Sequence, residues 1–127
     1  RLKNGDDYET RDGKIIKNGW VTYPNIPGRS YAFCADTIYD PQIAEKTKGV
    51  TMLYHEATYL QDLEERAAAR YHSTTTQAAA IAQQAEVQKL LIGHFSSKYE
   101  LLDDFLTEAQ SVFPNTQLAI EGTTYLI

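Results

Sequence analysis

The chain is poor in cysteine and in basic residues, and it has no long apolar run. Its single cysteine, Cys34, excludes an internal disulfide and fits a reducing compartment. Twelve Lys and Arg against 17 Asp and Glu give a net charge of −5, which argues against binding nucleic acid by phosphate neutralisation alone. No stretch approaches the roughly 18 apolar residues of a membrane span, and the first residues lack a signal-peptide apolar region. We therefore expect a cytoplasmic protein with no membrane contact.

What the chain does contain is enough for one folded domain, since 43% of its 127 residues are apolar. Turn-forming pairs such as Asn4-Gly5 and Pro27-Gly28 predict an irregular segment over residues 1–30. Over residues 31–127, helical and strand patterns alternate, which predicts an α/β fold with helices covering a mixed sheet. The strands are about half of those that a two-sheet hydrolytic fold needs. The domain is therefore expected to be the second half of something larger.

The expected elements follow from apolar spacing and from helix-start signals. Strands are expected at 31–35, 50–55, 89–92, 118–120 and 124–127. A helix that begins with Pro is expected at 41–48, and Leu60, Leu63, Ala67 and Tyr71 share one face of a second helix. Thr74 and Gln77 form a capping-box pattern that begins an alanine-rich helix ending near residue 85, and helical spacing returns at 99–113.

All three histidines lie in short polar segments at the ends of these elements. Asp36 and His94 each follow a strand, where loops build sites on a rigid scaffold. A carboxylate and a neutral imidazole together suit zinc or manganese. The alternative for Asp36 is an ordinary loop or capping residue.

Glu56 and His72 are candidates for moving protons. Strand alternation places His55 and Glu56 on opposite faces, so only one of the two can point into a given site. Glu56 beside an imidazole could hold the histidine in the tautomer that proton transfer needs. His72 precedes a helix N-terminus, which attracts anions such as phosphate. The alternatives are a solvent-exposed carboxylate and an exposed histidine before the cap.

Ser96 and Lys98 follow His94 directly and could contact a phosphate through a hydroxyl and a positive charge. The alternative is that this polar run caps the following helix, and Ser97 is then the better cap candidate.

Several segments, taken in order, resemble the C-terminal half of ribonuclease Z, a family of metallo-β-lactamase-fold endonucleases that process tRNA 3′ ends. They are Phe33-Cys34-Ala35-Asp36-Thr37, Leu53-Tyr54-His55-Glu56-Ala57-Thr58, His72-Ser73-Thr74, His94-Phe95-Ser96-Ser97-Lys98-Tyr99 and the closing stretch from Phe113 to Gly122. The resemblance covers roughly residues 30 to 127. The pairing of His-Glu-Ala-Thr with His-Ser-Thr is specific to this family within its superfamily.

The resemblance implies the C-terminal half of an αββα sandwich. It implies part of a zinc-dependent endoribonuclease that removes the 3′ trailer from precursor tRNA by hydroxide attack on a phosphodiester. Asp36 would bridge two zinc ions and His94 would bind one of them, while Glu56 and His72 would form a proton relay for the leaving 3′ oxygen.

The resemblance further implies that Ser96 and Lys98 lie near the scissile phosphate, although the family is expected to have arginine at position 98. Residues 1–30 would return from the tRNA-binding arm, and the protein would be a homodimer.

The family's His-x-His-x-Asp-His motif does not occur in these 127 residues. We therefore expect that an N-terminal half is missing and that the 127 residues alone are inactive. Two alternatives stay open, namely a related metal-dependent phosphodiesterase or hydrolase of the same fold, and a non-catalytic half that only binds a partner.

Overall fold

A computed structural model of the chain describes residues 8–9, 15–16 and 28–127. Strand β1 (Tyr8–Glu9) pairs antiparallel with β2 (Ile15–Ile16). Of the irregular segment expected over residues 1–30, residues 1–7, 10–14 and 17–27 lie outside the described residues. Within the described part of the chain, no helix is long and apolar enough to cross a membrane.

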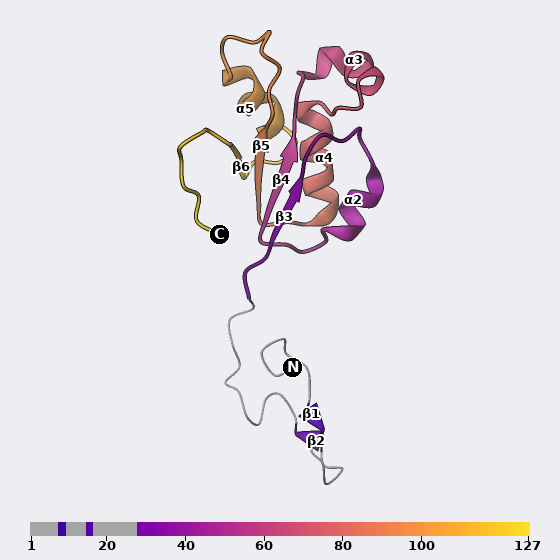
Figure 1. Ribbon diagram of the computed structural model, residues 1–127, viewed down its shortest axis with the longest axis vertical. Helices are drawn as coiled ribbons and strands as arrows, with labels where there is room; N and C mark the ends of the chain where they lie inside the picture. Colours follow the sequence, from indigo (N-terminus) through magenta and orange to yellow (C-terminus); the bar gives the residue numbers. More distant parts are fainter. Residues whose placement is uncertain (1–7, 10–14, 17–27) are drawn as a thin grey trace.

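A four-stranded sheet forms the centre of residues 28–127 (Figure 1). Its strands are β3 (Tyr31–Cys34), β4 (Met52–Glu56), β5 (Lys89–Gly93) and β6 (Thr116–Leu118). They lie side by side in chain order and every pair is parallel. The expected α/β architecture is thus present, but this sheet is parallel rather than mixed. All four carboxyl ends consequently meet at one edge of the sheet.

Three helices connect successive strands, namely α2 (Pro41–Lys46), α4 (Thr75–Ala85) and α5 (Asp103–Gln110). Each connection moves one strand further in the same direction, and parallel crossovers are right-handed, so all three helices lie on one face of the sheet. The core fills this layer, where Leu53, Leu90 and Ile92 of the strands meet Ala78, Ile81 and Phe105 of the helices.

The helix starts follow from local capping chemistry. Asp40 accepts a hydrogen bond from the Gln42 N–H at 2.9 Å, and Pro41 occupies the first helical position of α2. In α4, the Thr74 hydroxyl accepts from the Gln77 N–H while the Gln77 side chain accepts from the Thr74 N–H. The capping box expected from the sequence is therefore confirmed.

Four expected elements differ from the structure. The helix expected at 99–113 is limited to α5 at Asp103–Gln110, and the strand expected at 118–120 is β6 at Thr116–Leu118. The apolar positions from Leu60 to Tyr71 span a 3₁₀ turn (Gln61–Leu63) and the short helix α3 (Glu64–Ala69), not one helix. The helix ends early because Tyr71 adopts a left-handed conformation with φ of 59°, and the His72 N–H closes the end on Ala67 O.

The expected strand at 124–127 is also wrong, and the last strand is β6 at Thr116–Leu118. The Tyr125 hydroxyl bonds to Leu118 O and to the Ile120 N–H, so the chain turns back at this point. Residues 124–127 therefore add no strand to the sheet.

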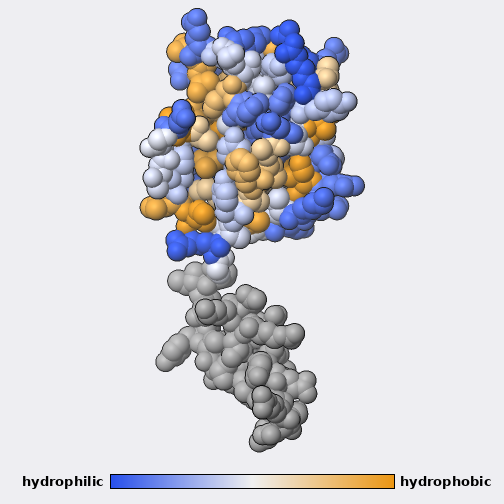
Figure 2. Space-filling model, viewed as in Figure 1, coloured by the Kyte–Doolittle hydropathy of each residue, from blue (hydrophilic) through white to orange (hydrophobic). Residues whose placement is uncertain are grey.

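The opposite face of the sheet carries no helix within the described residues. Phe33 and Tyr54 stack on this face with ring centroids 4.5 Å apart, and the Phe33 side chain is 62% exposed. Figure 2 shows apolar side chains gathered in the middle of the visible face, where Figure 1 draws β3. We call this surface, formed by Tyr31, Phe33 and Tyr54, the open face. An exposed aromatic surface on a parallel sheet is unusual, because such sheets are normally covered on both sides.

Candidate functional site

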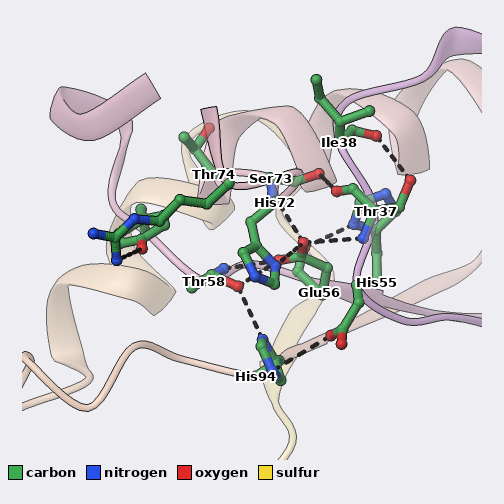
Figure 3. Close-up of polar contacts among 12 residues, drawn as sticks. Thr37, Ile38, His55, Glu56, Thr58, His72, Ser73, Thr74 and His94 are labelled. Carbon is green, nitrogen blue, oxygen red and sulfur yellow. Dashed lines mark hydrogen bonds and ion pairs between the residues drawn. The ribbon is translucent and has the colours of Figure 1, made fainter. Parts of the chain in front are cut away.

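The carboxyl edge of the sheet brings together four of the residues expected to carry chemistry. Glu56 is the last residue of β4, Asp36 comes two residues after β3, and His94 comes directly after β5. His72 comes two residues before the Thr74 cap of α4. Figure 3 shows the side chains of Glu56, His72 and His94 close together, and Asp36 Oδ1 lies 3.4 Å from His94 Nε2. The expected convergence at one edge is therefore confirmed.

Glu56 is the buried centre of this group, and its side chain is not accessible to solvent. Its Oε1 accepts from the Thr37 N–H at 3.1 Å, the Ser73 N–H at 2.9 Å and His72 Nδ1 at 2.9 Å. Its Oε2 accepts from the N–H of Thr58 at 3.0 Å and from the hydroxyl of Thr58 at 2.7 Å. Five donors thus surround one carboxylate, which offsets the large cost of burying it.

These bonds also tie three separate chain segments together. Thr37 follows β3, Thr58 follows β4 and Ser73 precedes α4. The Ser73 hydroxyl additionally donates to Thr37 O, and the Ser73 carbonyl accepts from the Thr58 N–H at 3.0 Å. The buried carboxylate therefore sets where the loops that carry Asp36 and His72 lie.

Nδ1 of each site histidine bonds to a neighbouring side chain, Glu56 for His72 and Thr58 for His94. Because Glu56 accepts at Nδ1 of His72, that nitrogen carries hydrogen, which in the neutral ring leaves the lone pair on Nε2. The rings of His72 and His94 stack with centroids 5.2 Å apart. The Nε2 of His94 lies 3.4 Å from Asp36 Oδ1.

Asp36, His72 and His94 form a group that could hold a cation. One oxygen of Asp36 and one ring nitrogen of each histidine all lie within 4.8 Å of one another. The side chains of Asp36 and His94 are 63% and 48% exposed, so solutes can reach them. Two imidazoles and a carboxylate are a donor set typical of catalytic zinc. The residues present therefore fit one metal ion.

Both exposed members of this group have unusual backbone conformations. Asp36 has φ of 43° and His94 has φ of 61°, in the left-handed region that non-glycine residues seldom adopt. Such conformations persist only where the surroundings hold them, and they concentrate at functional sites. Here the left-handed conformations turn the Asp36 and His94 side chains away from their strands and toward each other.

Gly93 leaves room for Tyr54 beside the site. A Cβ at this position would lie 2.5 Å from the Tyr54 hydroxyl and 2.8 Å from its ring. Burial raises the pKa of Tyr54, and the carboxylates of Glu56 and Asp36 raise it further. The Tyr54 hydroxyl is therefore neutral at physiological pH.

In the described part of the chain, the side chains of Ser96 and Lys98 form no hydrogen bond or ion pair with the four converging residues. The Ser96 N–H donates to Thr58 O at 2.9 Å, and the Ser96 hydroxyl accepts from the Lys98 N–H at 3.4 Å. The Lys98 ammonium lies 5.2 Å from the centroid of the Tyr99 ring. The alternative that Ser97 caps the next helix is wrong, since α5 begins only at Asp103 with Leu102 at the cap position.

His55 points away from the site, as the strand alternation predicts. It is fully buried, and its Nδ1 donates to Glu56 O at 2.8 Å. Its Nε2 has no hydrogen-bond partner in the described part of the chain. Burial lowers the pKa of His55, against weaker opposing effects from Glu56.

Three hydroxyl residues of the site were not expected from the sequence. Thr37, Thr58 and Ser73 each bond to Glu56 through the backbone, and two of them also bond through the side chain within the cluster. The signal was present, because each lies one or two residues from a candidate acidic or histidine residue. Spacing alone does not separate such residues from ordinary loop hydroxyls.

The chain is similar to known proteins over almost its whole length. No protein-family model matches the chain. The ribonuclease Z of Bacteroides thetaiotaomicron is 50% identical over 122 residues, which are 96% of this chain and 39% of that protein. The ribonuclease Z of Porphyromonas gingivalis strain W83 is 48% identical over 117 residues, 92% of this chain and 38% of that protein.

Among solved structures, the metallo-β-lactamase fold protein YhfI from Bacillus subtilis aligns with a TM-score of 0.67 at 22% identity. The alignment covers 72% of this chain and 37% of that protein, and it confirms the expected fold. The chain spans about two fifths of the length of the curated relatives it matches. Over almost its whole length, the chain is a homologue of ribonuclease Z.

Proposed function

We propose that this chain is the C-terminal part of a zinc-dependent endoribonuclease that removes the 3′ trailer from precursor tRNA. The observation that carries the proposal is the 50% identity to a ribonuclease Z over 96% of the chain. The convergence of Asp36, Glu56, His72 and His94 at one edge supports it, because a nuclease site needs these groups together. The same identity favours this enzyme over a related hydrolase or a non-catalytic half.

In this proposal Asp36 and His94 bind zinc. With hydrogen on Nδ1 of His94, the Asp36 oxygen and the His94 Nε2, which lie 3.4 Å apart, are both acceptors, an arrangement that a cation between them stabilises. When bound, zinc supplies Lewis acidity at the phosphate and lowers the pKa of a coordinated water. Two ions need more ligands than the described residues offer, so the remaining ligands would come from elsewhere in the complete protein.

Glu56 and His72 have different parts in the proposed proton relay. Glu56 is buried and accepts five hydrogen bonds, so it orients rather than touches the substrate. It holds hydrogen on Nδ1 of His72, so the lone pair of Nε2 can accept a proton from water, and the doubly protonated ring can then donate that proton to the leaving 3′ oxygen. The His72 side chain is 20% exposed, which leaves it accessible from one side.

Ser96 and Lys98 stay proposed as phosphate contacts. Both are within four residues of His94, and the backbone bond from Ser96 to Thr58 links this loop to the cluster. Lysine supplies a point charge and not the planar two-point contact of arginine. We therefore assign Lys98 a supporting role in binding the phosphate.

The partners of the proposed enzyme are precursor tRNA, the remaining part of the same protein and a second copy in a homodimer. The open face supports the remaining part of the same protein as a partner, because Tyr31 and Phe33 are 47% and 62% exposed where a sandwich fold would place another sheet. Residues 1–30 would then come from the arm that binds tRNA. A cytoplasmic location is part of this proposal.

The test uses the full-length protein and a precursor tRNA with a defined 3′ trailer. We expect cleavage that releases a tRNA with a 3′ hydroxyl and a trailer with a 5′ phosphate, and a chelator should stop it until zinc is restored. The 127 residues alone should not cleave. No cleavage by the full-length, zinc-loaded protein would refute the proposal.

A further inference from the structure

The hydroxyl of Thr58 lies between the buried carboxylate and one of the site histidines. Its Oγ1 is 2.7 Å from Glu56 Oε2 and 3.0 Å from His94 Nδ1 (Figure 3). Thr58 is only 5% exposed, so water does not compete freely for these two contacts. One side chain therefore links Glu56 to His94.

The direction of the two bonds follows from the number of hydrogens available. A hydroxyl has one hydrogen, and an ionised carboxylate only accepts. Glu56 already accepts three backbone N–H groups, from Thr37, Thr58 and Ser73, so both of its oxygens act as acceptors here. The Thr58 hydrogen accordingly points to Glu56 Oε2, and its oxygen accepts a hydrogen from Nδ1 of His94.

We propose that Thr58 is a positioning residue that fixes His94 in the tautomer with hydrogen on Nδ1. The lone pair of His94 Nε2 is then directed at Asp36, where the proposed zinc would bind. Glu56 in this way sets the tautomer of both site histidines, acting on His72 directly and on His94 through the Thr58 hydroxyl. The inference deepens the proposed function, since its consequence for zinc rests on His94 being a ligand.

Loss of the hydroxyl should make His94 a poorer ligand. Without an acceptor at Nδ1, hydrogen can occupy either ring nitrogen, and the ring orientation is less restricted. Removing a partner of this kind typically lowers metal affinity about 10–100-fold.

The experiment compares Thr58→Val, which lacks the hydroxyl, with Thr58→Ser, which keeps it, in the full-length protein. Thr47→Val is the matched control, because Thr47 is 6% exposed and, among the described residues, its hydroxyl bonds only to Ile43 O of α2, at 2.8 Å. The first readout is the His94 tautomer in metal-free protein, from long-range ¹⁵N–¹H NMR spectra recorded above the ordinary histidine pKa. The second readout is zinc affinity, from titration against a competing chelator.

We expect wild type, Thr58→Ser and Thr47→Val to hold hydrogen on Nδ1 of His94, with similar zinc affinities. Thr58→Val should show a mixed tautomer and bind zinc about 10–100-fold more weakly. Wild-type His94 with hydrogen on Nε2 would overturn the inference, even if Thr58→Val did not fold. An unchanged His94 tautomer in a folded Thr58→Val variant would also overturn the inference. A changed tautomer with full zinc affinity would support the hydroxyl link and instead count against His94 as a ligand.

Discussion

At the amino ends of β3 and β4, Ser30 and Thr51 exchange two hydrogen bonds, from each N–H to the other's hydroxyl, at 3.0 and 3.1 Å. At the carboxyl ends of the same strands, Glu56 takes five donors from three segments, while ring nitrogens of two histidines are left facing the Asp36 oxygen. Polar groups at the amino end satisfy one another. At the carboxyl end a buried, fully bonded carboxylate holds exposed groups that converge on one another, and chemistry is expected where such groups converge.

The sharpest test of this comparison removes an acceptor at each end. Asp36→Ala and His94→Ala should each lose most bound zinc and reduce precursor tRNA cleavage to background, because each removes a proposed ligand. Ser30→Ala at the amino end should keep both its zinc and its cleavage activity. Metal analysis of the full-length variants measures the zinc content, and single-turnover kinetics measure the cleavage rate. Normal zinc content in Asp36→Ala or His94→Ala would contradict the assignment.

The next test asks whether His72 binds metal or moves a proton. His72→Ala should keep most of the zinc and slow cleavage by about 10²–10⁴, the usual contribution of general acid–base catalysis. Lys48→Ala is the control and should cleave normally, because Lys48 forms only an exposed ion pair, with Glu86 at 3.8 Å. If His72→Ala loses zinc as Asp36→Ala does, then the three-residue group binds metal as a unit and the relay assignment is wrong.

A third test concerns the packing that supports the carboxyl end. Gly93→Ala should lower the free energy of unfolding by about 1–3 kcal/mol, the usual cost of overpacking, because the new Cβ would overlap the Tyr54 ring. Gly28→Ala is the control, since a Cβ there meets nothing within 4 Å in the described part of the chain. Urea unfolding measures both. Equal stability of the two variants would mean that Tyr54 moves aside at no cost.

The smallest expected effect is a pH dependence that originates in His55. Burial lowers its folded-state pKa below the ordinary value of about 6.5, so below that pH the unfolded chain binds more protons than the folded protein. Stability should therefore fall as the pH drops below about 6.5, until the folded-state pKa is also passed. His55→Leu should show a shallower acid slope in urea unfolding. An identical slope in both proteins would indicate that other groups dominate.

Much of this organisation could be predicted from residues close together in the chain. The Thr74 and Gln77 capping box, the proline start of α2 and strands β3, β4 and β5 follow from local pattern. The elements that differ depended on distant partners or on backbone strain. The helix expected through Tyr71 ends because that residue is left-handed, and residues 124–127 form no strand because Tyr125 bonds back to Leu118.

The sequence by itself predicted which candidate residues lie together, since Asp36, Glu56, His72 and His94 all lie at or near the end of a regular element, and parallel strands bring such ends to one edge. Only the tertiary structure decided how these side chains contact one another. Burial of Glu56, the left-handed turns at Asp36 and His94, and the bridging position of Thr58 depend on three loops that meet in space. Which nitrogen of a histidine keeps its lone pair depends on the partner across the fold, and no local pattern in the chain encodes that partner.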